Sequence, residues 1–207
     1  FLKVLPSIFM LYIFLMRITK YYSPNFNVKT RSSKSITFVI IHYTGMQSER
    51  ESLKRLISPN SKVSCHYFIR RNGEILSLVS DKNIAWHAGK SSWGKYKNLN
   101  KNSIGIELAN KGHRYGYQAF TKSQIKKLIQ LCKNLKKKYM IKNKFILGHS
   151  DVAPLRKIDP GEKFPWDYLH SKGVGIYPGK IRGPKKSLKN VDIQIFLRNL
   201  YKIGYRY

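Results

Sequence analysis

Runs of consecutive apolar residues alternate along this chain with segments in which apolar residues recur every three or four positions. The runs at 37–42, 103–108 and 144–149 are too short for helices and rich in β-branched residues, which predicts strands buried on both faces. Helical apolar spacing follows Ser48 and Thr121, and each of these residues precedes a glutamate or glutamine by three positions, as in a capping box. We therefore expect two helices between the three strands.

A β-hairpin is expected after the first of these helices. Two strand-like runs, at 65–71 and 74–79, flank the dipeptide Asn72-Gly73, and Asn-Gly is the strongest short signal for a tight turn between antiparallel strands. Strands that alternate with helices, together with one hairpin, indicate the α/β class. The predicted architecture is a single domain with a central mixed β-sheet flanked by helices.

The two ends of the chain depart from this pattern. Lys3 precedes an apolar run at 4–16, which is typical of a secretory signal or a short membrane anchor, with a hydrophobic core helix as the alternative. Apolar spacing at 191–200 predicts a terminal helix that Gly204 could end. We expect a signal or anchor segment, a linker, a folded domain and a basic tail rich in glycine and proline, at residues 1–20, 21–35, 36–170 and 171–207.

The charge of the chain is strongly unbalanced. The 40 lysine and arginine residues face 10 aspartate and glutamate residues, so the net charge is +30. Such a chain attracts polyanions, which include nucleic acid, anionic lipid and acidic wall polymer. The lysines are spread along the chain with no helix-turn-helix, zinc-finger or RNA-binding signature, so no specific nucleic-acid partner is expected.

Candidate chemistry lies at the ends of the predicted strands. His42 and His149 each end a buried run, and Asp159 follows ten residues later in a loop rich in proline and glycine. Ligand sites in α/β folds form beyond the carboxyl ends of strands, where these side chains could converge, although strand-end histidines are often structural. Two nitrogen donors and one oxygen donor with an open fourth position describe a catalytic zinc site, which suits amide hydrolysis. Glu107 is the only charged residue of its strand.

Five segments support this interpretation when taken together. In chain order they read FVIIHYTG, CHYFIRRNGEI, AWHAGKSSW, NSIGIELAN and ILGHSDVAPLRKIDPG. They resemble the zinc N-acetylmuramoyl-L-alanine amidases of the amidase type 2 family, which includes the peptidoglycan recognition proteins, and the resemblance covers roughly residues 36–169. A zinc amidase domain at 36–170 is therefore expected. The segment after residue 190 resembles the opening helix of a peptidoglycan-binding module.

The resemblance assigns roles to individual residues. It implies that one Zn²⁺ ion is held by His42, His149 and Asp159, that Glu107 is the catalytic carboxylate, and that Lys157 stabilises the oxyanion. Candidate substrate-binding residues are His87, Trp86, Asn110, Arg71 and His66. His87 could equally support a metal ligand through a hydrogen bond without binding the metal itself. His66 could instead be a packed structural histidine.

The expected function is zinc-dependent hydrolysis of the amide bond between N-acetylmuramic acid, or its 1,6-anhydro form, and L-alanine. The expected partner is peptidoglycan or a muropeptide, with an anionic membrane or wall surface as a further partner. The apolar amino terminus favours the cell envelope, either the periplasm or the inner membrane as an anchor site, over the cytoplasm. A non-catalytic peptidoglycan-binding module is the main alternative, and a basic nucleic-acid binder is a third.

Overall fold

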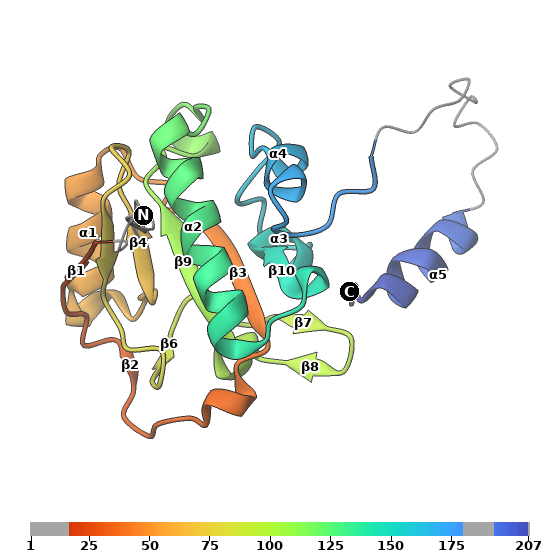
Figure 1. The fold of residues 1–207 in the computed structure, drawn as a ribbon, viewed down its shortest axis with the longest axis horizontal. Coiled ribbons are helices and arrows are strands. Elements are labelled where there is room, and N and C mark those ends of the chain that lie inside the picture. Colours follow the sequence, from red (N-terminus) through yellow and green to blue (C-terminus); the bar gives the residue numbers. More distant parts are fainter. Residues whose placement is uncertain (1–16, 180–192, 207) are drawn as a thin grey trace, which may run out of the picture.

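A mixed β-sheet forms the centre of the fold in the computed structural model, which describes residues 17–179 and 193–206 (Figure 1). The predicted α/β architecture, a central mixed sheet flanked by helices, is confirmed. Its six strands within those residues lie in the spatial order β1 (Ile18–Lys20), β5 (Ile75–Ser77), β4 (Tyr67–Ile69), β9 (Ser103–Leu108), β3 (Phe38–Tyr43) and β10 (Ile146–Gly148).

The central strands are parallel and covered on both faces. The neighbours β4, β9, β3 and β10 pair in parallel, and the side chains of Phe38 through Ile41 are completely buried. Parallel strands of this kind need apolar residues on both sides, which explains their continuous apolar runs. β5 pairs antiparallel with β4 across Asn72-Gly73, where Gly73 has a φ of +90°. The predicted hairpin is therefore present.

One face of the sheet is covered by the long helix α2 (Lys122–Tyr139), which lies across β9 and β3 in Figure 1. Its amino terminus is a complete capping box, because Thr121 accepts from the Gln124 amide and the Gln124 side chain accepts from the Thr121 amide. The predicted apolar stripe is buried against the sheet and consists of Ile125, Leu128, Ile129, Cys132 and Leu135.

The opposite face is covered by α1 and by an irregular segment. α1 (Glu49–Ile57) begins at Ser48, whose hydroxyl accepts from the Glu51 amide, and it buries Leu53 and Leu56 against Phe68. The segment 84–102 covers the rest of this face. It contains β6 (Ile84–Ala85), β7 (Ser92–Trp93) and β8 (Tyr96–Lys97), which the apolar pattern did not predict.

The expected linker at 21–35 is instead part of the folded domain. Upstream of it, β1 adds a strand to the edge of the sheet, and β2 (Phe26–Asn27) pairs with β6. Ser23 and Asn25 are buried, and the Asn25 amide donates to the carbonyl oxygens of Ser58 and Val63 at 2.8 Å each. The polar composition was misleading because these polar side chains bond to backbone groups of the domain. The apolar run at 4–16 lies outside the described residues.

The carboxyl-terminal part consists of three helices within the described residues. α3 (His149–Val152) and α4 (Trp166–Ser171) follow β10, and the predicted terminal helix is α5 (Ile193–Ile203), which ends just before Gly204. The chain end returns to the domain, since the Tyr205 hydroxyl donates to Asp151 at 2.5 Å.

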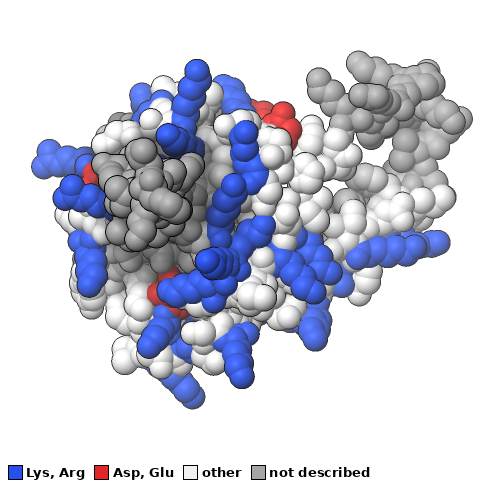
Figure 2. Space-filling view, viewed as in Figure 1, with Lys and Arg blue, Asp and Glu red and all other residues white. Residues whose placement is uncertain are grey.

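The surface of the fold is basic, as the composition predicts. Lysine and arginine side chains are numerous on the face shown in Figure 2, with many of them along its middle, and acidic side chains are few there. This distribution fits the net charge of +30. In the parts of the chain that the structure describes, none of the helices combines the length and the hydrophobicity of a membrane span.

Candidate active site

His42 and Glu107 face the same side of the sheet from adjacent strands. They are register partners on β3 and β9, and side chains of register partners on parallel strands point the same way. Alternation along β3 places His42 on the side of Phe38 and Ile40, which pack against the segment 84–102 and not against α2. The site therefore lies on the face opposite α2.

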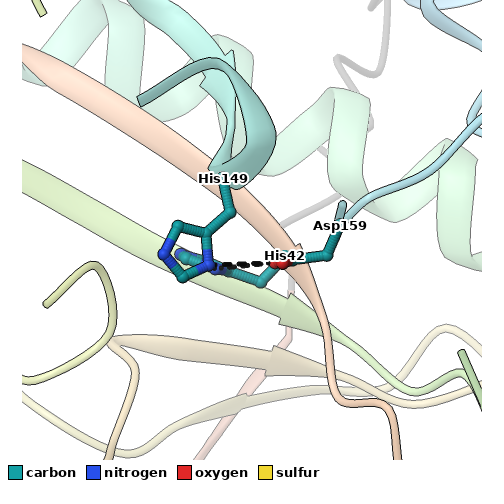
Figure 3. A group of neighbouring side chains, drawn as sticks. All are labelled: His42, His149 and Asp159. Atoms are coloured by element: carbon teal, nitrogen blue, oxygen red, sulfur yellow. Dashed lines mark hydrogen bonds and ion pairs between the residues drawn. The ribbon is translucent and has the colours of Figure 1, made fainter. Parts of the chain in front are cut away.

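His149 and Asp159 reach the same point from the neighbouring strand. His149 follows directly after β10, whose Gly148 is in register with Ile41 of β3. The loop then folds back, and the Ser150 amide donates to the carbonyl oxygen of Asp159 at 2.8 Å. The three side chains point toward one another in Figure 3. His42 Nδ1 lies 2.9 Å from His149 Nδ1, and Asp159 Oδ2 lies 3.1 Å from each of these nitrogens.

These three atoms form a site for a cation. The outer nitrogen of His149, Nε2, lies 3.1 Å from the carbonyl oxygen of Ala88, which can only accept, so in a neutral ring Nε2 carries the hydrogen. The inner Nδ1 then presents a lone pair to the Asp159 carboxylate. Zinc binds imidazole nitrogen and carboxylate oxygen at about 2.0–2.2 Å, and the observed separations allow one ion to reach all three donors. The predicted ligand set therefore fits a single zinc ion.

The protonation states also suit a metal site. Burial and the neighbouring His149 lower the pKa of His42 to about 4, so its imidazole is neutral at pH 7. Burial alone would raise the pKa of Asp159, but the neighbouring His149 and His42 rings outweigh it and lower the pKa below its usual value. Neutral imidazoles and an ionised carboxylate are the forms that bind zinc.

Glu107 stands beside the three donors as a buried acid. Burial, followed by repulsion from Asp159, raises its pKa to about 8, while Lys157 acts in the opposite direction. Its Oε2 atom is buried, and no described residue forms a hydrogen bond with it. Glu107 and Lys157 both line a cavity of about 780 Å³ that also exposes His149 and Asp159. Glu107 is therefore a buried acid at the wall of this cavity.

The cavity wall contains only part of the predicted substrate-binding set. Trp86 and His87 line it. His66, Asn110 and Arg71 do not appear among the described residues of the wall, so their assignment as substrate contacts stays a prediction. Each has a structural environment. His66 is fully buried under β9, the Asn110 amide donates to the carbonyl oxygen of Gln118 at 2.8 Å, and the Arg71 backbone binds Glu49 and Thr121 at the hairpin.

Other wall residues were not assigned from the sequence. They come from the end of β3, from α1, from the loop after β9 and from the 153–158 turn, and include Tyr43, Arg55, His113, Arg114, Tyr115 and Arg156. The Tyr43 hydroxyl lies 2.8 Å from His113 Nδ1, and His113 Nε2 lies 2.9 Å from Glu162. Loop residues of this kind follow no apolar period, so only the folded chain identifies them.

The structural role of His66 makes a testable prediction about acid stability. Burial, followed by the charge of Arg31, lowers the pKa of His66 to about 3, whereas an unfolded chain has a histidine pKa of about 6.5. Between these values only the unfolded chain binds the proton, so the stability that is complete above pH 6.5 decreases as the pH falls toward 3. In metal-free protein we expect the free energy of unfolding to fall, between pH 7 and 4.5, by about 2 kcal/mol more in the native chain than in His66→Asn.

The asparagine variant is a suitable comparison. It keeps an acceptor near His66 Nδ1, which receives the Gly105 amide at 3.0 Å, but it does not titrate. The free energy of unfolding is measured by denaturant titration at both pH values. Equal losses in the two proteins would contradict the prediction.

The fold and the site together define a candidate metal-dependent hydrolase, and comparisons with known proteins specify its family. The model of the N-acetylmuramoyl-L-alanine amidase family matches residues 32–162. The amidase AmiD of Escherichia coli K12 is 39% identical over 155 residues, which are 69% of this chain and 55% of AmiD. The 1,6-anhydro-N-acetylmuramyl-L-alanine amidase AmpD of Haemophilus influenzae is 34% identical, over 72% of this chain and 89% of AmpD.

Solved structures give the same result. The complex of Escherichia coli AmiD with anhydro-N-acetylmuramic acid-L-Ala-D-γ-Glu-L-Lys has a TM-score of 0.74 at 34% identity and covers 84% of this chain and 73% of AmiD. AmpDh3 of Pseudomonas aeruginosa with an anhydromuramic pentapeptide has a TM-score of 0.72 at 29% identity, over 89% of this chain and 80% of AmpDh3. The chain belongs to the N-acetylmuramoyl-L-alanine amidase family, as its motifs predicted.

Proposed function

We propose that this chain hydrolyses the amide bond between the lactyl group of N-acetylmuramic acid, or of its 1,6-anhydro form, and L-alanine. The observation that carries the proposal is the convergence of His42, His149 and Asp159 within 3.1 Å, with His149 and Asp159 in the wall of a cavity that the buried Glu107 also lines. The names of the related AmiD and AmpD proteins and the ligands in the AmiD and AmpDh3 structures support the substrate class.

The three donors are proposed to hold one zinc ion. When bound, zinc supplies Lewis acidity, which lowers the pKa of water to about 7 and polarises a carbonyl group. Glu107 is proposed to act first as the general base and then as the general acid. Its carboxylate takes a proton from the attacking water as the oxygen bonds to the carbonyl carbon, and it returns that proton to the nitrogen as the C–N bond breaks. The products are a free lactyl carboxylate and the amino group of L-alanine.

Lys157 is proposed to stabilise the negative charge that develops on the carbonyl oxygen. It lines the cavity two residues before Asp159, and its charge acts on both His42 and Glu107. A fixed cation in a partly buried cleft stabilises an oxyanion more than it stabilises a neutral carbonyl, which lowers the barrier.

The experiment that tests this function is mass spectrometry of defined muropeptides after incubation with the zinc-loaded chain. Ordinary and 1,6-anhydro muramyl peptides are offered in parallel, so the masses report the bond that is cut and the sugar that is accepted. We expect free peptide that begins with L-alanine. Binding of the muropeptide without any cleavage would support the alternative, a non-catalytic peptidoglycan-binding module.

We propose the cell envelope as the place of action. The net charge of +30 and the basic flanks of the apolar run at 4–16 support this location, because wall polymers and membrane surfaces are anionic. Cell fractionation tests it. Recovery of the full-length protein only in the cytoplasmic fraction would favour the alternative, hydrolysis of imported muropeptides.

A further inference from the structure

The outer nitrogen of His42 is held by a chain of contacts that ends on a backbone carbonyl. His42 Nε2 lies 3.0 Å from His87 Nδ1, and His87 Nε2 lies 3.1 Å from Ser103 Oγ. Ser103 Oγ lies 2.6 Å from the carbonyl oxygen of Leu99. His42, His87 and Ser103 are buried, so these groups depend on one another for hydrogen bonding.

The direction of every hydrogen bond in this chain follows from its last member. The Leu99 carbonyl can only accept, so the single hydroxyl hydrogen of Ser103 is donated to it and Ser103 Oγ accepts from His87 Nε2. A neutral His87 then has no hydrogen on Nδ1, which accepts from His42 Nε2. His42 Nδ1 is left with a lone pair, and this is the atom that faces His149 and Asp159.

The backbone next to His87 also supports His149. The carbonyl oxygen of Ala88, the residue after His87, accepts from His149 Nε2 at 3.1 Å. The backbone amides of His87 and Ala88 both donate to Asn100 Oδ1, at 3.2 and 2.7 Å. The turn at residues 87–88 therefore determines which ring nitrogen of His42 and of His149 is free to bind a metal.

Gly105 of β9 makes room for this arrangement. A Cβ atom at position 105 would lie 2.3 Å from Cγ of His87, which is far inside van der Waals contact. The His87 ring thus packs directly on the backbone of β9 between the register partners His42 and Glu107 on one side and Ser103 on the other. The sheet and the turn together hold the imidazole in one orientation.

We propose that His87 and Ser103 are positioning residues that set the hydrogen arrangement of His42, so that its Nδ1 lone pair is directed toward the metal. The inference rests on the proposed metal site and adds to it two residues that lie outside the set of three donors. Groups that orient metal-bound histidines in this way usually contribute about 10- to 100-fold in metal affinity.

The test compares zinc affinity among folded variants of the full chain. The zinc dissociation constant is measured by competition with a chromophoric chelator, and the visible spectrum of the cobalt-substituted protein reports ligand geometry. His87→Leu removes the acceptor for His42, whereas His87→Asn keeps an oxygen acceptor near the position of Nδ1. We expect His87→Leu to weaken zinc binding about 10- to 100-fold and to change the cobalt spectrum. His87→Asn should recover most of the affinity.

Ser103→Ala and Ser23→Ala form a matched pair. Both serines are buried, and the Ser23 hydroxyl donates to the carbonyl oxygen of Leu56 at 2.5 Å without contact to a histidine. We expect Ser103→Ala to weaken zinc binding about 10-fold and Ser23→Ala to leave the affinity unchanged. The thermal midpoint of each metal-free variant records any general loss of stability. If His87→Leu does not fold, the zinc affinities of Ser103→Ala and Ser23→Ala test whether the hydrogen-bond chain positions His42.

Three outcomes would each contradict a different part of the proposal. Equal zinc affinity in the native chain and in His87→Leu, with an unchanged cobalt spectrum, would refute the positioning role while leaving the metal site intact. Equal affinities of Ser103→Ala and Ser23→Ala would refute the role of Ser103. A native chain that binds no zinc would refute the proposed function together with the inference.

Discussion

Replacing Glu107 with glutamine is expected to lower kcat about 10²- to 10⁴-fold, because a positioned general base contributes a factor of this size. Gln has the shape of Glu but cannot take a proton from water, so the cavity keeps its form while the proton acceptor is lost. Glu107 is buried, and none of the described residues forms a hydrogen bond with its Oε2 atom. The measurement is the steady-state rate of release of L-alanyl peptide from a muropeptide.

The pH profile provides a second readout for this variant. Burial and Asp159 raise the pKa of Glu107 to about 8, so its basic form and therefore kcat/KM increase as the pH rises toward this value. A bound cation favours the carboxylate and moves this limb to lower pH. The limb should be missing in Glu107→Gln. Glu74→Gln is the control, since Glu74 lies in the hairpin and pairs with Arg70. Activity that is the same in Glu107→Gln and in the native chain would leave binding as the function.

Removal of the metal is expected to abolish hydrolysis and to destabilise the protein. Lewis acid stabilisation is worth several kcal/mol, so dialysis against a chelator should reduce kcat by at least about 10³-fold, and added zinc should restore it. An ion that binds only the folded chain stabilises it by about 4 kcal/mol at a thousand times its dissociation constant. The thermal midpoint should rise accordingly when zinc is added.

Variants of the ligands separate this effect from general damage. His42→Ala leaves two donors, His149 and Asp159, and should lose both the activity and the zinc-dependent rise in the midpoint. His170→Ala serves as the matched control because His170 is exposed and is not among the described residues of the cavity wall, and its Nδ1 contacts the carbonyl oxygen of Gly175 at 3.3 Å. Full cleavage by metal-free native protein would contradict the zinc mechanism.

Two of the three proposed metal ligands and Glu107 could be found from the sequence because each is tied to a regular element. His42 and His149 end apolar runs, and Glu107 is the single charge in one. Their positions follow from strand periodicity once the strands are recognised. Asp159 was harder, since it lies in a loop, and the family motif identified it where periodicity could not.

The predicted substrate contacts are tied to motifs and not to the ends of strands, and a motif alone specifies the role of a residue less well. His66 and Asn110 lie in family-like segments, but one packs under β9 and the other ties a loop to the Gln118 carbonyl. A motif shows that a residue matters to the fold or to the site without showing which. Burial distinguishes the two cases, and burial depends on neighbours that are distant in the chain.

The amino-acid sequence by itself determined the main strands and helices of this protein and the family of its chemistry. Apolar periods and capping residues depend on interactions within a few positions, so strands β3 and β9 and helix α2 were predicted correctly from local pattern. Tertiary structure decided everything that needed distant partners. It placed His42 beside His149 across 107 positions of sequence, brought residues 18–27 into the sheets, and set His87 behind a metal ligand. The physical reason is that strand pairing and burial join residues whose separation along the chain has no local signal.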